Sequence, residues 1–290
     1  MTIPGTIIAA HGRQYRVELP GGEILPCFPR GKKSEIACGD RVTVKRSGED
    51  QGVIESVAPR STLLYRSNEF RQKLIAANVT QIVVVVATEP SFSDELITRC
   101  LVAAESQDIQ ALIVLNKCDL ADRVESCERI LAPFEALGYS VLRLSARAGG
   151  HQIRPYLNGQ TSVLVGQSGM GKSTLINALV PDAATATREI SAALDSGKHT
   201  TTHATLYRLD EQSSLIDSPG LQEFGLNHLS ADAIEHGFPE LRRLHGQCRF
   251  RDCRHDREPG CAVLAALERG EIDRRRYVVF RALRSEAAGN

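Results

Sequence analysis

The sequence predicts a multidomain protein with three parts: a small N-terminal β-barrel, a central α/β domain on a largely parallel sheet, and a mostly α-helical C-terminal domain. Three observations lead to this fold class. Residues 1–60 contain short strand patterns broken by Gly and Pro, residues 74–230 alternate apolar strands with helical stretches, and residues 231–290 are helical around a group of Cys and His. At 290 residues the chain is long enough for two or three domains.

Composition points to a soluble protein. The hydrophobic fraction is 42% and the charged fraction 24%, both ordinary for a globular chain. The longest apolar runs, such as 82–87, are too short to span a bilayer, and the chain does not open on a signal-peptide pattern. We therefore expect a cytoplasmic protein without a membrane partner. In that reducing compartment the eight cysteines are free thiols or metal ligands rather than disulfides.

Charge is unevenly spread along the chain. Formal net charge is +4 over residues 1–73, −8 over residues 74–236 and +4 over residues 237–290. Basic flanks suit a polyanionic partner such as RNA. A modest charge excess is also common on small domains, so charge alone leaves both interpretations open.

Five short strands are expected in the N-terminal part, at 5–8, 14–19, 23–25, 40–45 and 52–57. Alternation is clearest at Tyr15, Val17 and Leu19, and Gly21-Gly22 favours a hairpin turn. Five strands in about sixty residues fit an OB-type barrel. An SH3-like barrel is the alternative.

The segment 61–73 is basic and shows little periodicity, so we interpret it as a linker or loop. Beyond it, six apolar strands are expected, at 82–86, 111–115, 141–144, 162–165, 205–209 and 214–216. Runs of β-branched residues suit strands that are covered on both faces, and hence a mostly parallel sheet between helices.

A phosphate-binding loop is the first functional motif. The pattern G-x-x-x-x-G-K-S lies between the strand 162–165 and the helical stretch 174–179, which is the context that this motif requires. Backbone N–H groups there can surround phosphates, Lys172 can reach the β- and γ-phosphates, and Ser173 can coordinate Mg²⁺. The candidate nucleotide-binding residues are Gly166, Gln167, Ser168, Gly169, Met170, Gly171, Lys172, Ser173 and Thr174.

A guanine-reading motif follows another strand, where Asn116, Lys117, Cys118 and Asp119 stand in sequence. The Asp119 carboxylate can accept from both N–H groups of guanine, which adenine lacks, so the motif favours GTP over ATP. After the next strand, Ser145 and Ala146 fit a loop whose backbone N–H contacts the base.

Two further segments are candidate switches. Asp217 and Gly220 form the pattern D-x-x-G at a strand end, where Asp217 can hold the Mg²⁺ shell through water and the Gly220 N–H can sense the γ-phosphate. Thr201 or Thr202 is expected to supply a second hydroxyl to Mg²⁺. All these motifs belong to GTPases, yet here the guanine motif precedes the phosphate loop. The order is that of a circularly permuted GTPase domain.

The C-terminal part carries a candidate zinc site. Cys248, Cys253, His255 and Cys261 lie within fourteen residues and match a closed Cys₃His site, hence a structural Zn²⁺. Arginines surround them at 249, 251, 254, 257 and 274–276, and arginine is a natural phosphate contact. Because Asp252, Asp256 and Glu258 are interleaved, a salt-bridged surface is the alternative to RNA contact.

The permuted order, the segment 197–202, the D-x-x-G segment and the cysteine cluster together resemble the bacterial ribosome small-subunit-dependent GTPase A family. The resemblance covers essentially the whole chain. It implies a slow GTPase that binds the small ribosomal subunit and its rRNA late in assembly, is stimulated by that subunit, and acts as a checkpoint there. Other assembly factors are further candidate partners, and nothing in the sequence demands a dimer.

The residue that orients the attacking water is not obvious from the sequence. Leu221 occupies the position of the usual glutamine and cannot hydrogen-bond water, so intrinsic hydrolysis should be slow. His228 is a candidate catalytic residue, with a helix-starting role as the alternative. Two other functions remain open: an RNA clamp in which hydrolysis is incidental, and a metabolic enzyme or kinase.

Overall fold

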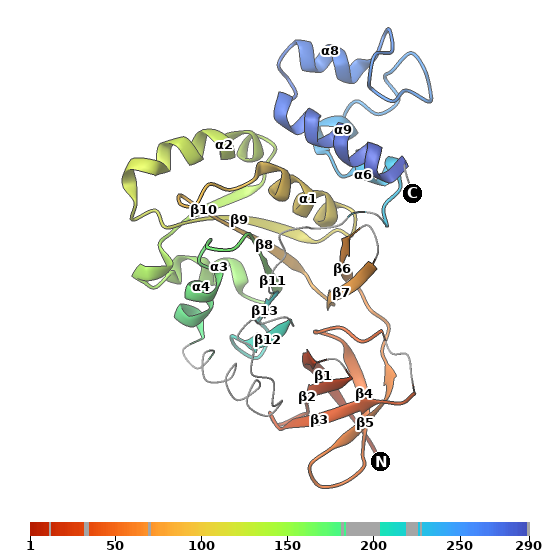
Figure 1. Ribbon diagram of the computed structural model, residues 1–290, viewed down its shortest axis with the longest axis vertical. Helices are drawn as coiled ribbons and strands as arrows, with labels where there is room; N and C mark the ends of the chain where they lie inside the picture. The colour runs from red at the N-terminus through yellow and green to blue at the C-terminus, as the bar shows by residue number, and fades with distance from the viewer. Residues whose placement is uncertain are drawn as a thin grey trace.

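The computed structural model describes residues 1–11, 13–31, 35–68, 71–180, 183, 204–218, 226 and 228–288, without the side chains of 11, 66–68, 71–73 and 288. Figure 1 shows three parts in a row: the barrel at the N-terminal end, the α/β sheet in the middle, and the C-terminal helices at the far end. None of the helices that the structure describes is long and apolar enough to cross a membrane.

The barrel contains β1 (Thr2–His11), β2 (Gln14–Glu18), β3 (Ile24–Pro29), β4 (Arg41–Arg46) and β5 (Gly52–Val57). The strands run in the order β1-β2-β3-β5-β4, and β4 pairs back onto β1 to close the barrel. Inward residues such as Ile7, Val17 and Val44 are completely buried. The OB-type prediction is therefore confirmed over the SH3-like alternative. The expected turn joins β2 to β3, where Gly21 and Gly22 have φ of +92° and +84°.

The segment that we interpreted as a linker is instead a β-hairpin, made of β6 (Leu63–Asn68) and β7 (Arg71–Ala77). Its base is packed, because Leu64, Ile75 and Ala76 are buried and Cys38 forms a bridge to Ala76. The linker interpretation was wrong because the apolar residues that anchor the hairpin lie only at its two ends. The basic stretch between them lacks the alternation that marks a strand.

The central sheet runs in the order β10-β9-β8-β11-β13-β12 and is parallel except for the last strand. All six expected strands are present. Their bounds are β8 (Gln81–Ala87), β9 (Gln110–Asn116), β10 (Ser140–Arg143), β11 (Thr161–Val165), β12 (Thr205–Arg208) and β13 (Ser214–Asp217). Every residue of β8 is buried, as expected for a strand covered on both faces.

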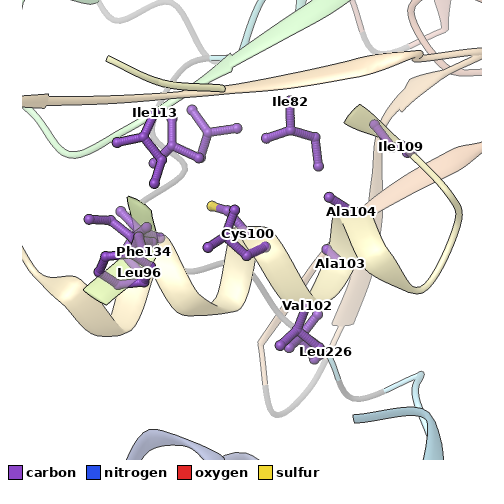
Figure 2. Packing of buried hydrophobic residues seen from close by; sticks show 14 of the residues in the cluster. Ile82, Leu96, Cys100, Val102, Ala103, Ala104, Ile109, Ile113, Phe134 and Leu226 are labelled. Atoms are coloured by element: carbon purple, nitrogen blue, oxygen red, sulfur yellow. The ribbon is translucent and has the colours of Figure 1, made fainter. Parts of the chain in front are cut away.

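Helices cover the two faces of this sheet. Alternate β8 residues serve two cores: Ile82 faces α1 (Asp94–Glu105) and α2 (Val124–Ala136), while Val83 faces α3 (Arg154–Leu157) and α4 (Lys172–Leu179). Figure 2 shows the first of these cores, with Cys100 and Ala104 of α1 turned toward Ile82 and Ile113 of the sheet. Where the structure describes this domain, it also has short 3₁₀ turns at Ala121–Arg123, Ala146–Ala148 and His151–Ile153.

The C-terminal part consists of α6 (Ala231–His236), α7 (Pro239–Arg242), α8 (Ala262–Glu268) and α9 (Arg274–Ala288). It shares one continuous hydrophobic core with α1 and the sheet. Inside this core Arg276 forms a buried ion pair with Glu240, at 2.5 Å between Nε and Oε1. The Arg276 guanidinium also lies 5.3 Å from the Phe134 ring of α2. The C-terminal helices are therefore packed tightly against the α/β domain.

The barrel meets the other edge of the sheet. Strand β1 pairs antiparallel with β12 at Ala9 and Thr205, which makes barrel and sheet continuous. Beside this pairing the Arg208 guanidinium lies 2.6 Å from the Glu18 carboxylate. The edge strand β12 therefore connects the two parts.

Candidate guanine nucleotide site and metal centre

The predicted nucleotide-binding loops meet at the carboxyl ends of the parallel strands, where ligands bind in open α/β sheets. Asn116 ends β9, Ser145 follows β10, the phosphate loop follows β11 and Asp217 ends β13. A cavity of about 360 Å³ opens there. It is lined by Asn116, Lys117, Ser145, Ala146, Arg147, Ser168, Gly169, Gly171, Lys172, Ser173 and Thr174.

The Asn116 side chain holds three of these loops together. Its Nδ2 donates to the Met170 carbonyl at 2.9 Å, and its Oδ1 accepts from the backbone N–H groups of Ala146 at 2.9 Å and Lys117 at 2.8 Å. The side chain is only 1% exposed. Since every polar atom of this buried amide is paired, it fixes the guanine loops against the phosphate loop.

Two glycines of the phosphate loop are required by close packing. A Cβ on Gly166 would lie 2.2 Å from the Val85 carbonyl oxygen, and one on Gly171 would lie 2.3 Å from Asn116 Nδ2. Gly171 also has a φ of +88°. Any larger residue would therefore push the loop away from its neighbours.

Lys172 and Asp217 form the charged part of the site. The Lys172 ammonium donates to the carbonyls of Gly166 at 2.5 Å and Gln167 at 3.0 Å, so it points along the loop. Burial lowers the pKa of Lys172, and the negative charge of Asp217 opposes that change. Burial likewise raises the pKa of Asp217, and Lys172 opposes it. The two groups are near enough to sense each other's charge.

Asp119 is exposed and is not among the residues that line the cavity, although its neighbours Ser145, Arg147 and Lys117 are. A hydrogen bond from the Ser145 side chain lowers the pKa of Asp119, and the charges of Arg147 and Lys117 act in the same direction. The carboxylate is thus kept ionised, as an acceptor for guanine must be. Arg147 was not foreseen, although its place directly after Ser145-Ala146 is a signal that could have identified it.

Three predicted site residues, Thr201, Thr202 and Gly220, lie outside the described residues, as do the neighbouring positions 219 and 221–225. Leu226 is buried against α1, beside Val102 in Figure 2. His228 follows it, and its ring lies 5.1 Å from that of Tyr65, between ring centroids. Desolvation lowers the pKa of the His228 imidazole. The contact with the β6–β7 hairpin was not foreseen.

The four predicted zinc ligands converge in the C-terminal part. The ligand atoms of Cys248, Cys253, His255 and Cys261 all lie within 4.8 Å of one another. The Sγ atoms of Cys248 and Cys261 are 3.9 Å apart, and His255 Nδ1 is 3.6 Å and 3.3 Å from them. A tetrahedron with Zn–S bonds of about 2.3 Å has S···S edges of about 3.8 Å. The donor set and its spacing therefore fit a zinc ion.

A second layer of contacts holds the histidine of this centre. His255 Nε2 lies 3.2 Å from the Glu235 carboxylate, which is also 2.9 Å from Arg284. The Tyr277 hydroxyl donates to the His255 carbonyl at 2.6 Å. A carboxylate behind a ligating histidine fixes the ring and its tautomer. Through these contacts the loop is fastened to α6 and α9.

Fold and site together define a circularly permuted GTPase. Residues 57–227 match the family model described as RsgA GTPase. The chain is 52% identical over 289 residues to "Small ribosomal subunit biogenesis GTPase RsgA" of Burkholderia pseudomallei (strain K96243), covering 98% of this chain and 92% of the relative. It is 54% identical over 279 residues to the protein with the same name in Nitrosospira multiformis, covering 96% and 89%. The chain belongs to the RsgA GTPase family.

Solved structures agree with this assignment. The structure of YjeQ from Thermotoga maritima is 31% identical, covers all of both chains and has a TM-score of 0.76. YloQ, described as a circularly permuted GTPase, is 27% identical, covers 100% of this chain and 96% of its own, and has a TM-score of 0.72. The resemblance read from the motifs is therefore confirmed at the level of both family and fold.

Proposed function

We propose that this GTPase binds the small ribosomal subunit and its rRNA and assists late maturation of that subunit, with slow intrinsic hydrolysis that the subunit stimulates. The observation that carries the proposal is the meeting of the guanine loops and the phosphate loop at one cavity, in a chain whose close relatives are named small ribosomal subunit biogenesis GTPases. The free cysteines of the chain support a cytoplasmic location. We propose that it acts as a monomer.

For the nucleotide, the proposed roles follow the geometry. Asp119 accepts from guanine. The Ala146 N–H, here bonded to Asn116 Oδ1, turns to the base when the nucleotide binds, while the bond from Asn116 to the Met170 carbonyl keeps the loops in register. Backbone N–H groups of residues 166–174 surround the phosphates at the N-terminus of α4. Lys172, now bonded to loop carbonyls, turns to the phosphates when they bind.

Two metal ions are part of the proposal. Mg²⁺ would be held by Ser173, by Asp217 through water and by Thr201 or Thr202, and would neutralise charge on the phosphates. Zn²⁺ would be held by the Cys₃His set and is structural, because four protein ligands leave no open position.

For hydrolysis, we propose that His228 positions or deprotonates the attacking water when the protein is on the subunit. Its lowered pKa keeps the imidazole neutral, as a proton acceptor must be. After hydrolysis, the contacts to the γ-phosphate would be lost, and the protein would then be released from the subunit. Because the C-terminal helices share a core with α1, we propose that they move with the α/β domain, against the barrel.

The test is steady-state GTP hydrolysis by the protein alone, with small subunits, and with large subunits. We expect strong stimulation by small subunits only, and tighter subunit binding with a non-hydrolysable GTP analogue than with GDP. Equal affinities in both nucleotide states, or no stimulation by either subunit, would refute the proposal. A variant that binds GTP but cannot hydrolyse it should stay on the subunit; normal release would favour a clamp in which hydrolysis is incidental.

A further inference from the structure

One large aromatic side chain in the metal-binding loop faces solvent. Phe250 lies between Cys248 and Cys253 and is 42% exposed. The guanidinium carbon of Arg249 lies 5.5 Å from the centre of its ring. The loop is part of the C-terminal region, at the end of the molecule far from the N-terminus (Figure 1). An exposed aromatic ring beside arginine is a common arrangement for contacting nucleobases.

The loop holds this ring in place. The Arg249 N–H donates to the Gly260 carbonyl at 3.0 Å, so the two arms of the loop are joined directly before Phe250. Gly260 has a φ of +76°, and a Cβ there would lie 3.0 Å from Arg249 Cβ. The proposed metal ligands Cys248 and Cys253 flank the ring on both sides. A loop whose backbone is already ordered loses little conformational freedom on binding.

The acidic residues of the loop pair with only one of its four arginines, Arg257. The Glu258 carboxylate accepts from the backbone N–H groups of Arg254, Asp256 and Arg257, which lowers its pKa to about 2. Asp256 pairs with Arg281, in α9, and more distantly with Arg257. The salt-bridged surface considered from the sequence is therefore present in part, at Asp256, but it does not include Arg249, Arg251 or Arg254.

Three arginines of the loop that carries the ring therefore remain available. Arg249, Arg251 and Arg254 are exposed, and among the described residues none of them forms an ion pair with a carboxylate. Asp252 and Glu258 likewise form no ion pair with an arginine in the same part of the chain. The net charge of the loop around Phe250 is thus positive, which favours the binding of phosphate groups.

We propose that Phe250 is a stacking platform for an unpaired base of single-stranded RNA, and that Arg249, Arg251 and Arg254 contact the phosphates beside it. This inference deepens the proposed function and rests on its RNA partner. The RNA is single-stranded because bases in a duplex are already stacked on their neighbours and do not offer a free face. The ring binds without sequence preference, since every base has such a face.

The first experiment uses the full zinc-loaded chain and a fluorescein-labelled twelve-nucleotide oligo(A), with an RNA duplex of equal length as comparison. We expect Phe250→Ala to weaken single-strand binding about tenfold, the loss typical of one base–aromatic stack, and to leave duplex binding unchanged. Tyr156→Ala is the matched control, because Tyr156 is 43% exposed on α3, away from the loop. Zinc content and melting temperature establish that each variant is folded.

Salt dependence separates stacking from phosphate contacts. Phe250→Ala should leave the slope of log K against log salt unchanged, whereas Arg251→Ala should reduce it by about 0.7. Equal losses for single strand and duplex, or unchanged single-strand binding by Phe250→Ala, overturn the proposal.

A second variant keeps the test decisive if Phe250→Ala does not fold. The chain contains no tryptophan, so Phe250→Trp adds a single indole that can still stack. We expect wild-type affinity and quenching of the indole fluorescence on titration with oligo(A). Binding without quenching overturns the proposal. If Phe250→Ala impairs binding to small subunits but not to oligo(A), the platform contacts protein and the inference is wrong, while the proposed function stands.

Discussion

The ring of Tyr65, on the β6–β7 hairpin, lies 5.1 Å from the imidazole of His228, with 45° between the ring planes. Tyr65 precedes the central sheet in sequence, and His228 follows its last strand. The contact therefore connects a hairpin in the basic N-terminal third of the chain with the stretch that begins at the D-x-x-G motif. Anything that moves the hairpin can move the proposed catalytic histidine.

Replacing this histidine tests its role directly. We expect His228→Ala to lower subunit-stimulated hydrolysis about 100-fold, the scale of lost general base catalysis, with unchanged GTP affinity. Tyr65→Ala should reduce stimulation without affecting the slow intrinsic rate. Tyr156→Ala serves as an exposed-tyrosine control. Normal stimulated turnover by His228→Ala would exclude His228 from the reaction.

The pH dependence follows from the lowered pKa of His228. Desolvation disfavours the charged imidazole, so the neutral form persists below the ordinary value of 6.5. Only the neutral form can accept a proton from water. Stimulated hydrolysis should therefore stay level from about pH 8 down to about 6.5 and fall at lower pH. The pH–rate profile with saturating subunits measures this, and His228→Ala should lack the acid limb. A midpoint above 6.5 would contradict the assignment.

Nucleotide choice should depend on Asp119. Asp119→Asn removes one acceptor for the two guanine N–H groups, so GTP affinity should fall about 100-fold, given a few kcal/mol for hydrogen bonds to a charged group. Xanthine carries a carbonyl in place of the exocyclic amine, and the new amide can donate to it. XTP binding by the variant should therefore exceed its GTP binding, measured by fluorescence competition. If Asp119→Asn binds GTP as tightly as the wild type, Asp119 does not contact the guanine base.

The buried ion pair should matter far more than an exposed one. Glu240→Ala leaves the Arg276 guanidinium charged inside the core, where both side chains are at most 5% exposed. Such a loss typically costs about 3–5 kcal/mol in the free energy of unfolding. Glu271→Ala is the matched control, because it breaks an ion pair with Arg269 whose side chains are both 55% exposed, and exposed pairs contribute little to stability. Urea denaturation compares the two, and equal shifts would argue against a fastening role for Arg276.

The proposed zinc centre should depend on a residue that is not a ligand. Glu235→Gln keeps the shape of the side chain but removes the carboxylate behind His255. We expect zinc affinity to fall about 10–100-fold, as is usual when a residue that holds a metal ligand in place is replaced. Competition with a chromogenic chelator gives the affinity. Glu268→Gln, an exposed substitution on α8, is the control and should change nothing.

Most of the fold, and the kinds of ligand that the protein binds, could be predicted from local sequence patterns. The β8 run and the phosphate loop are contiguous in sequence, so their periodicity and spacing predict them. The missed features join distant positions. Arg276 and Thr98 of α1 are 178 residues apart and in contact, and Tyr65 meets His228 across most of the chain. Such tertiary pairs leave no local signal, and the hairpin escaped notice because its packing is limited to its base.

The pairing of Ala9 with Thr205 attaches the barrel to β12, directly after the segment that contains Thr201 and Thr202. The C-terminal helices instead follow the segment after Asp217. Each basic flank is thus anchored beside a different predicted switch, although one γ-phosphate would govern both. A surface that engages only one flank leaves the other switch unconstrained. The arrangement has the logic of a coincidence detector, which responds to two features of a particle only when they stand at the right separation.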